Sequence, residues 1–505
     1  MHSLTVEKVG DKARQSVKWS FSLQIIQKII FFASSIVLAR ILTPKDFGIS
    51  AIAITFDTII WVITSFGINS AIIHFQDNIE ERLNAGFWLF LVSAAVFVSL
   101  QVLLAPMVAN FYHEPVLADI LRVTAIAIFI FSLGAIQKTI LIKNIEFKKI
   151  SILDTILGII KSSLYMILAL LGFGVWSFIY PKVIISVIST AILWNLTKWR
   201  PKLEFNFKYW IEMFRYGKNV LFSNIVDYFI NNSSYILIGS LIGSTSLGIY
   251  TFAYDKSMMV VNNITYPVSM ISFPAFSKLQ DYKDRLKNGF LKTIKMISIL
   301  TFPCAFGQVV LGPEYINTIF GHKWQASIVI FQMILIYSML RSISQCGTSL
   351  LNGVGRPDIT LKCNLAYAPI FIGSVYLGSK VGGLYGIGLV TSLVGSIWAI
   401  VFISIVVRKL KWRLRDITDA LKASFLSSII MGAVIFLLKL FLKNLNFSNI
   451  LILIILMPIG VLTYALSIKL FFQDTYEFIL DSLQKFLNKE NKIKNVLQKQ
   501  RAEEA

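Results

Sequence analysis

The sequence predicts an all-α integral membrane protein with about 14 transmembrane helices. We expect two parallel six-helix lobes around a central cleft, plus two extra C-terminal helices. Three observations carry this prediction. The first is composition: of 505 residues, 56% are hydrophobic and 15% are charged, with a mean hydropathy of +0.70. A water-soluble domain does not carry so large an apolar fraction. The second is the length of the apolar runs, and the third is an internal repeat.

The apolar runs are long enough to cross a bilayer as helices, which need about 20 apolar residues each. The run "FLVSAAVFVSLQVLLAPMVA" is apolar on every face, whereas barrel strands alternate over about ten residues. The polar segment 1–16 does not fit a cleavable signal peptide, so we expect the first helix to be both targeting signal and mature structure. In chain order, the expected spans are 17–40, 48–72, 85–110, 117–141, 150–172, 174–196, 216–242, 248–272, 288–311, 324–351, 359–379, 383–407, 421–443 and 446–472.

Cations gather in alternate loops. Loops that follow even-numbered spans hold most of them, in segments 138–149, 198–215, 278–287 and 408–415. Loops that follow odd-numbered spans offer little more than Lys45, Lys323, Lys380 and Lys443. The positive-inside rule therefore predicts that both termini are cytoplasmic. The net charge of +21 is then mostly loop bias toward anionic lipid, and nucleic acid is not an expected partner.

The chain contains an internal duplication. The segment "SSIVLARILTPKDFGI" from Ser34 aligns with "SSYILIGSLIGSTSLGI" from Ser233. A second block, "QDNIEERLNAGF" from Gln76, aligns with "QDYKDRLKNGF" from Gln280 at nearly the same offset. Each copy holds six expected helices, so both copies enter the membrane from the same side as parallel repeats.

Each repeat begins with a turn that joins its first two helices at the outer face. We expect Pro44 with Gly48, and Gly243 with Gly248, to break the helices there. Two parallel lobes around a cleft are typical of transporters that expose the cleft to each side in turn. The expected organisation is an N-lobe at 1–196, a basic cytoplasmic linker at 197–215, a C-lobe at 216–407, helices thirteen and fourteen at 408–472, and a cytoplasmic tail at 473–505.

Ionisable residues inside the expected spans are the candidate functional residues. Each costs on the order of 3 kcal/mol if it faces lipid at mid-helix, so they must face a wet cavity or be paired. The alternative of packed ion pairs between helices is strongest for Lys182 and Lys256. Cations in a transporter cleft predict an anionic substrate. The candidate headgroup contacts are Lys28, Lys161, Arg341, Lys182 and Lys256, and the candidate coupling or gating carboxylates are Asp57, Asp227 and Asp255.

The repeat suggests one specific pair. At the offset that aligns the paired serines, Lys28 and Asp227 occupy equivalent positions in the two copies. We expect them to pair across the cleft in one state, with substrate or a proton breaking the pair. The alternative is that each faces its own lobe's interior.

Features of an enzyme are missing from the sequence. The four histidines are scattered, and no metal-ligand spacing, P-loop or nucleophile elbow appears. "NGVGRPD" from Asn352 follows an apolar span rather than a strand and is expected to be a turn. We therefore expect no catalytic residues, no metal and no cofactor.

Several segments resemble one family. "LARILTPKDFGISAIA", "GINSAIIHFQD", "IGSTSLGIYTFAYDKSM", "ISFPAFSKLQD" and "LNGVGRPDITLKCN" are similar to polysaccharide transporters of the multidrug/oligosaccharidyl-lipid/polysaccharide flippase superfamily. The likeness is to Wzx-type lipopolysaccharide and exopolysaccharide flippases, particularly the colanic-acid-exporter-like group, and it spans roughly residues 15–410.

The resemblance implies export of an undecaprenyl-pyrophosphate-linked oligosaccharide from the inner to the outer leaflet of a bacterial cytoplasmic membrane by alternating access. It implies that Lys28, Lys161 and Arg341 contact the headgroup, with coupling to H⁺, Na⁺ or the membrane potential left open. The expected partners are this lipid-linked substrate, the bilayer, and a glycan polymerase with other assembly proteins. Polar and aromatic residues that could contact the glycan are Tyr165, Asn231, Tyr235 and Tyr254.

Other functions remain open at this level. One is a cation-coupled drug or small-molecule antiporter, although an acidic cavity would suit cationic drugs better than Lys28 does. The others are a scaffold or processing enzyme of surface-glycan assembly, and a lipid scramblase. The segment after residue 473 has apolar residues at helical spacing, and we expect a cytoplasmic helix lying partly on the membrane.

Overall fold

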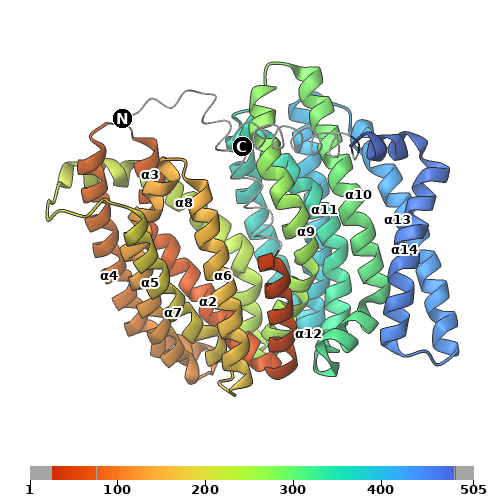
Figure 1. Cartoon of the computed structure of the whole chain (residues 1–505), viewed down its shortest axis with the longest axis horizontal. Coiled ribbons are helices and arrows are strands. Elements are labelled where there is room, and N and C mark those ends of the chain that lie inside the picture. The colour runs from red at the N-terminus through yellow and green to blue at the C-terminus, as the bar shows by residue number, and fades with distance from the viewer. Residues whose placement is uncertain (1–25, 76, 483, 485–505) are drawn as a thin grey trace, which may run out of the picture. The chain divides into compact units, whose positions relative to one another are not determined.

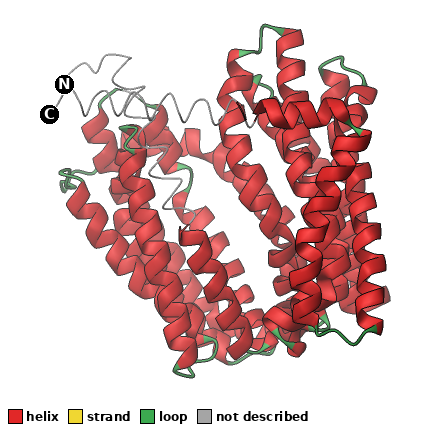
Figure 2. Ribbon diagram, turned by 45° about the vertical axis from the view of Figure 1, so that its right-hand side comes forward, coloured by secondary structure: helices red, strands yellow, loops and turns green. Residues whose placement is uncertain are grey.

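The computed structural model describes residues 26–75, 77–482 and 484. Within this part, every regular element is a helix (Figure 2). The expected start of the first span at 17–25 and most of the expected tail lie outside the described residues. A helix covers 26–41, and a short one covers 473–482. Those between are α2 Pro44–Ser65, α3 Ile68–His74, α4 Ile79–Tyr112, α5 Val116–Lys143, α6 Phe147–Leu170, α7 Trp176–Leu196, α8 Phe207–Leu241, α9 Ser244–Lys278, α10 Lys283–Tyr315, η1 Ile316–Phe320, η2 His322–Trp324, α11 Ser327–Gly353, α12 Pro357–Lys409, α13 Leu414–Asn444 and α14 Asn449–Phe471.

Ten helices in the described part are long and apolar enough to cross a membrane. α8 and α9 are outside this set although each has 35 residues. The second half of α8 carries Asp227, Asn231 and Asn232 within its apolar sequence, which lowers its hydropathy. In α12 the backbone leaves the helical region at Gly382 and Gly383, between the spans expected at 359–379 and 383–407. The polypeptide is thus an all-helical, multi-pass membrane protein.

The chain divides into two compact units. The first comprises residues 1–254, 319–330 and 361–391, and the second comprises 255–318, 331–360 and 392–505. In the first unit α4, α5 and α7 lie side by side (Figure 1). Apolar side chains such as Phe87, Phe90 and Ile136 fill the space between α3, α4 and α5. In the second unit α10, α13 and α14 pack together through Leu311, Met431, Ile452, Leu456 and their neighbours.

The two turns of the repeat pack against each other within the first unit. A side chain added to Gly48 would overlap the Ser244 carbonyl, and one added to Gly248 would overlap the Pro44 carbonyl. The two first turns of α2 and α9 therefore cross with backbone against backbone, and the contact is nearly symmetric. Small residues allow such close approach between membrane helices.

This contact corrects the role expected for two glycines. Gly48 and Gly248 do not break the helices, because both lie inside them, in α2 and α9. The breaks come from other residues. Thr43 caps α2 with its side chain, in a reciprocal capping box with Asp46, and Pro44 takes the first helical position. In the second turn Gly243 supplies the left-handed backbone, at φ +109°.

A segment from further along the chain covers this crossing. Trp324 is fully buried, stacks on Phe252 with ring centroids 4.0 Å apart, and meets the edge of Phe47 at 4.9 Å. Its indole nitrogen donates to the Ala39 carbonyl at 2.9 Å. Lys323 Nζ donates to the Leu42 carbonyl at 2.6 Å. The free carbonyls at the end of helix 26–41 thereby gain donors.

Candidate functional site

Asp57 is the centre of a buried polar cluster in the first unit. It lies on α2 and is 4% exposed. Lys182 of α7 contacts its Oδ2 at 2.6 Å. On the other oxygen, Gln101 Nε2 of α4 donates at 2.9 Å and Thr124 Oγ1 of α5 donates at 2.8 Å. Four helices thus contribute to one satisfied carboxylate.

This arrangement bears on two candidate residues at once. Asp57 neutralises the charge of Lys182. The two residues form a packed ion pair between helices, which was the alternative that the sequence analysis gave for Lys182. Because a quarter of the Lys182 side chain stays exposed, the pair still reaches accessible space. Gln101 and Thr124 were missed by the sequence analysis. A signal existed for Gln101, a lone amide within a long apolar run.

Lys28 and Lys161 lie on adjacent helices. Helix 26–41 lies against α6, as the hydrogen bond from Ser34 Oγ to the Ser162 carbonyl at 3.2 Å shows. The side-chain amide of Gln27 packs against Gly158, in the space that a side chain at that position would occupy. Lys161 follows Gly158 by three residues, about 4.5 Å along the axis, so Lys28 and Lys161 lie at similar depth. Two of the three cations expected at the headgroup therefore lie on neighbouring helices.

Their surroundings differ. Lys28 is exposed and Lys161 is half-buried. The Lys161 ammonium lies 5.4 Å from the centre of the Tyr165 ring, a contact that stabilises a cation without removing its charge. Tyr165 in turn packs edge-on against Phe178 of α7 at 5.7 Å. Tyr165, expected at the glycan, thus supports Lys161.

Asp227 lies on α8 and is exposed. Its Oδ1 accepts a hydrogen bond from Asn364 Nδ2 of α12 at 3.1 Å. The Asn231 side chain donates back to the Asp227 carbonyl at 2.7 Å. Among the described residues no ion pair joins Asp227 to Lys28, so the expected pairing stays a prediction for another state. Asn364 was missed, and nothing in its local sequence distinguishes it.

Three tyrosines form an aromatic group on α8 and α9. The rings of Tyr235, Tyr250 and Tyr254 are 6.0 to 6.1 Å apart. Tyr250 is almost fully buried, and its hydroxyl lies 3.2 Å from Thr391 Oγ1. Tyr235 and Tyr254 are half-buried. The structure therefore joins two of the expected glycan contacts through a third tyrosine that the sequence analysis did not select.

The remaining candidates lie in the second unit. Arg341 on α11 is half-buried and donates from Nη1 to the Tyr337 hydroxyl at 3.3 Å. Asp255 and Lys256 follow each other on α9, and Lys256 is half-buried whereas Asp255 is exposed.

An ion cluster that the sequence analysis missed joins α10 to α13. Glu314 is 1% exposed and contacts Lys439 Nζ at 2.9 Å and Lys443 Nζ at 2.6 Å. Lys439 also donates to the Val310 carbonyl at 2.7 Å. Lys439 lies within the span expected at 421–443 and could have been selected by the same rule as Lys161. Among the described residues, no three His, Cys, Asp or Glu side chains gather where they could hold a metal ion.

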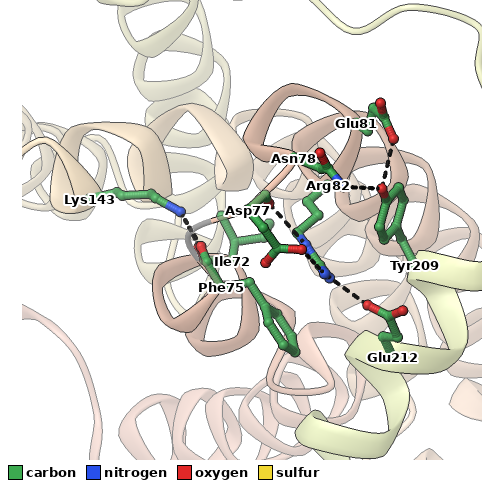
Figure 3. A network of polar contacts seen from close by, with 9 residues as sticks. All are labelled: Ile72, Phe75, Asp77, Asn78, Glu81, Arg82, Lys143, Tyr209 and Glu212. Atoms are coloured by element: carbon green, nitrogen blue, oxygen red, sulfur yellow. Dashed lines mark hydrogen bonds and ion pairs between the residues drawn. The ribbon is translucent and has the colours of Figure 1, made fainter.

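A second polar network surrounds Arg82, which lies in the first copy of the second repeated block (Figure 3). Its guanidinium contacts Asp77 at 2.8 Å and Glu212 at 2.9 Å, and it lies over the rings of Phe75 and Tyr209. The hydrogen bond from Arg82 lowers the pKa of Asp77 below its ordinary value.

Tyr209 of α8 extends this network to Asn78 and Glu81 at the start of α4. Its hydroxyl donates to Glu81 at 2.8 Å and accepts from Asn78 at 2.9 Å. The hydrogen bond to the Glu81 carboxylate raises the pKa of Tyr209. The network therefore fixes the start of α8 to the loop before α4.

Comparisons with known proteins agree with this architecture. Lipopolysaccharide biosynthesis protein WzxC of Escherichia coli (strain K12) is 24% identical over 75% of this chain and 77% of its own. Succinoglycan biosynthesis transport protein ExoT of Rhizobium meliloti (strain 1021) is 23% identical over 82% of this chain and 83% of its own. The structure titled "Lipid II flippase MurJ, inward closed conformation" superposes with a TM-score of 0.74 at 16% identity, covering 90% of this chain and 99% of that one.

The fold is therefore that of the MurJ structure. The family model described as polysaccharide biosynthesis protein matches residues 37–329, more than half of the chain. The resemblance found in the sequence is thus confirmed, and the chain belongs to the polysaccharide biosynthesis protein family.

Proposed function

We propose that this protein is a flippase. It moves an undecaprenyl-pyrophosphate-linked oligosaccharide from the inner to the outer leaflet of a bacterial cytoplasmic membrane. The observation that carries the proposal is the fold shared with a lipid II flippase over 90% of the chain. Membership of a polysaccharide biosynthesis family supports a saccharide-bearing substrate. Transport without catalysis accords with the names of the relatives, one of which is a transport protein.

In this proposal the cations bind the pyrophosphate. Lys28 and Lys161 lie on adjacent helices at similar depth, and neither is neutralised by a carboxylate among the described residues. An ammonium group that no carboxylate neutralises can form strong charge-assisted hydrogen bonds with a phosphate. Lys182 contributes less, because Asp57 already binds it. Arg341 is the third headgroup contact, and Tyr235 with Tyr254 contacts the glycan.

The proposed topology has 14 helices. Twelve of them form two parallel six-helix lobes with a cationic central cavity, and both termini are cytoplasmic. The lobes expose the cavity to each side in turn, and the interior-negative potential favours outward movement of an anionic headgroup by about 2.3 kcal/mol per charge per 100 mV. A coupled proton or sodium ion would act through Asp57, Asp227 or Asp255.

The test is to delete the gene and determine which leaflet holds the lipid-linked oligosaccharide. Complementation then compares Lys28→Ala and Lys161→Ala with Lys148→Ala, an exposed lysine on the same helix as Lys161. We expect the intermediate to stay in the inner leaflet, with rescue by Lys148→Ala and not by the other two. Normal arrival in the outer leaflet after deletion would refute the proposal and favour an antiporter or an assembly scaffold.

A further inference from the structure

The segment that joins α7 to α8 exposes a row of large apolar side chains. Leu203 is 79% exposed, Phe207 66% and Ile211 60%. Phe205 and Phe214 are also more than half exposed. We call these five residues the linker surface. Glu204, Asn206, Lys208 and Glu212 lie between them in the chain, so apolar and polar side chains are interspersed here. The exposed cations of the segment are Lys198, Arg200, Lys202, Lys208, Arg215 and Lys218.

The linker surface is held in a fixed orientation. Tyr209, Glu212 and Met213 occupy one face of the first turns of α8, where Met213 is fully buried and the other two join the Arg82 network (Figure 3). Residues spaced by three or four share a helix face. Phe207 and Ile211 are therefore directed to the opposite face, away from the first unit's interior, whereas the half-exposed ring of Phe214 stacks on Phe66 with ring centroids 4.6 Å apart.

The non-helical part before α8 is also anchored. Trp88 Nε1 of α4 donates to the Lys202 carbonyl at 2.7 Å, and the Lys202 amide donates to Asn84 at 3.1 Å. The Trp88 ring lies 5.1 Å from that of Phe205. The exposure of Leu203 and Phe205 thus results from specific contacts of their neighbours with α4.

The length of α8 indicates the level of this surface. Thirty-five residues extend about 52 Å, whereas the hydrocarbon core is about 30 Å thick. About 15 residues of α8 therefore lie beyond the core. The first turns, which carry Lys208, Glu212 and Arg215, are the end that costs least to place there, at the level of the headgroups. Aromatic side chains and snorkelling cations are favoured at that level.

The charge of the segment points to an anionic occupant. Residues 197–218 carry six cations and two carboxylates, Glu204 and Glu212, for a net charge of 6 − 2 = +4. Glu212 is already bound to Arg82. Apolar side chains interspersed with lysine and arginine are typical of segments that insert among acyl chains while contacting anionic headgroups.

We infer that residues 198–218 form a binding surface for anionic phospholipid at the membrane interface. Leu203, Phe207 and Ile211 insert between the acyl chains, and the cations contact the phosphates. The inference takes from the proposed function only the cytoplasmic side of this surface, and it requires no transport. Its test is therefore independent of whether the protein moves an oligosaccharide.

The test uses the full chain in nanodiscs of phosphatidylcholine, with or without phosphatidylglycerol. The variant Lys198→Gln/Lys202→Gln/Lys208→Gln is compared with Lys278→Gln/Lys283→Gln/Lys292→Gln, which removes three exposed cations elsewhere. Retained phosphatidylglycerol is counted by native mass spectrometry. Amide hydrogen exchange of residues 203–214 shows whether lipid binds at the linker surface. Residues 201–206 lie outside a helix, so their amides exchange fast unless something covers them.

We expect phosphatidylglycerol to slow exchange in residues 203–214 of the wild type and the control. In the linker variant this effect should vanish, and the affinity for phosphatidylglycerol should fall about fivefold per lysine removed, since each cation near an anionic surface contributes about 1 kcal/mol. If exchange is equally slow with and without phosphatidylglycerol, the surface is an ordinary lipid-facing one. If exchange is fast in both kinds of nanodisc, lipid does not cover the surface and a protein partner is the alternative occupant. Either outcome, or equal losses in the two variants, overturns the inference.

Discussion

At the scale of single residues, the candidate charges differ in whether they are already paired. Asp57 and Lys182 neutralise each other in a four-helix cluster. Lys161 contacts the ring of Tyr165 and no carboxylate among the described residues, and Lys28 is exposed. Depth in the membrane, which selected all four residues from the sequence, therefore does not determine what each one does. Lys182 is held by a buried carboxylate, whereas Lys28 and Lys161 are the lysines that the proposed function assigns to the headgroup.

The Asp57–Lys182 pair predicts a pattern in stability. Lys182→Met leaves a carboxylate that is buried and unpaired, which typically costs about 3–5 kcal/mol. Asp57→Asn should cost less, because Lys182 retains some exposure. The double variant should recover part of the loss, since neither charge remains. The measurement is the thermal unfolding midpoint in detergent for all four proteins, and losses that simply add would contradict direct pairing.

The Arg82–Asp77 contact predicts a dependence on pH. The pKa of Asp77 is lowered in the folded state, so its contribution to stability is complete above the ordinary carboxyl pKa of about 3.9. It is lost as pH falls through the lowered folded value. The difference in unfolding midpoint between wild type and Asp77→Asn should therefore stay constant from pH 7 to pH 5 and shrink below about pH 4. A difference that grows on acidification would be inconsistent with this pair.

At the scale of elements, the repeat determines how α2 and α9 meet. The turn residues of the two copies become contact partners, because Gly48 and Gly248 bring the backbones together. Trp324 then packs over both helices through Phe47 and Phe252. A duplication recognised in the sequence thus appears as a nearly symmetric helix crossing.

The close crossing of α2 and α9 predicts that adding a single methyl group at Gly48 destabilises the fold. Gly48→Ala places a Cβ against the Ser244 carbonyl, so the helices must separate, and overpacking of this kind typically costs about 1–3 kcal/mol. Gly373→Ala is the matched control, because Gly373 is helical and has open space beside it. There alanine should be neutral or stabilising, as the better helix former. Equal unfolding midpoints for the two variants would argue against the close crossing.

At the scale of the whole molecule, α13 and α14 are built into the second unit. Leu311 of α10 packs with Met431 and Leu456 of these helices. The buried Glu314 of α10 has both of its cations on α13. The buried carboxylate of Glu314, which lies inside the repeat, is therefore neutralised by α13, a helix outside the repeat.

Truncation should show this dependence. A chain that ends after Lys411 leaves the Glu314 carboxylate without Lys439 and Lys443, and it exposes the apolar face of α10. We expect poor accumulation and aggregation, measured by fluorescence-detected size-exclusion chromatography of a fusion protein. Adding Glu314→Gln to the truncated chain should partly restore a monodisperse peak, because the unpaired charge is removed. Truncated protein that is as monodisperse as the full chain would show that α13 and α14 are dispensable for the fold.

The sequence by itself determined the all-helical membrane class, the repeat and the family resemblance. These follow from local composition, periodicity and short matched segments, which need no knowledge of neighbours in space. It also selected Asp57, Lys161 and Lys182, since any charge within an apolar run is costly. Only the tertiary structure decided that Asp57 neutralises Lys182, that Gly48 and Gly248 are contacts rather than breaks, and that Glu314 joins α10 to α13. Those facts depend on which helix faces meet, and an apolar run that is hydrophobic all round carries no periodic signal of the face it will bury.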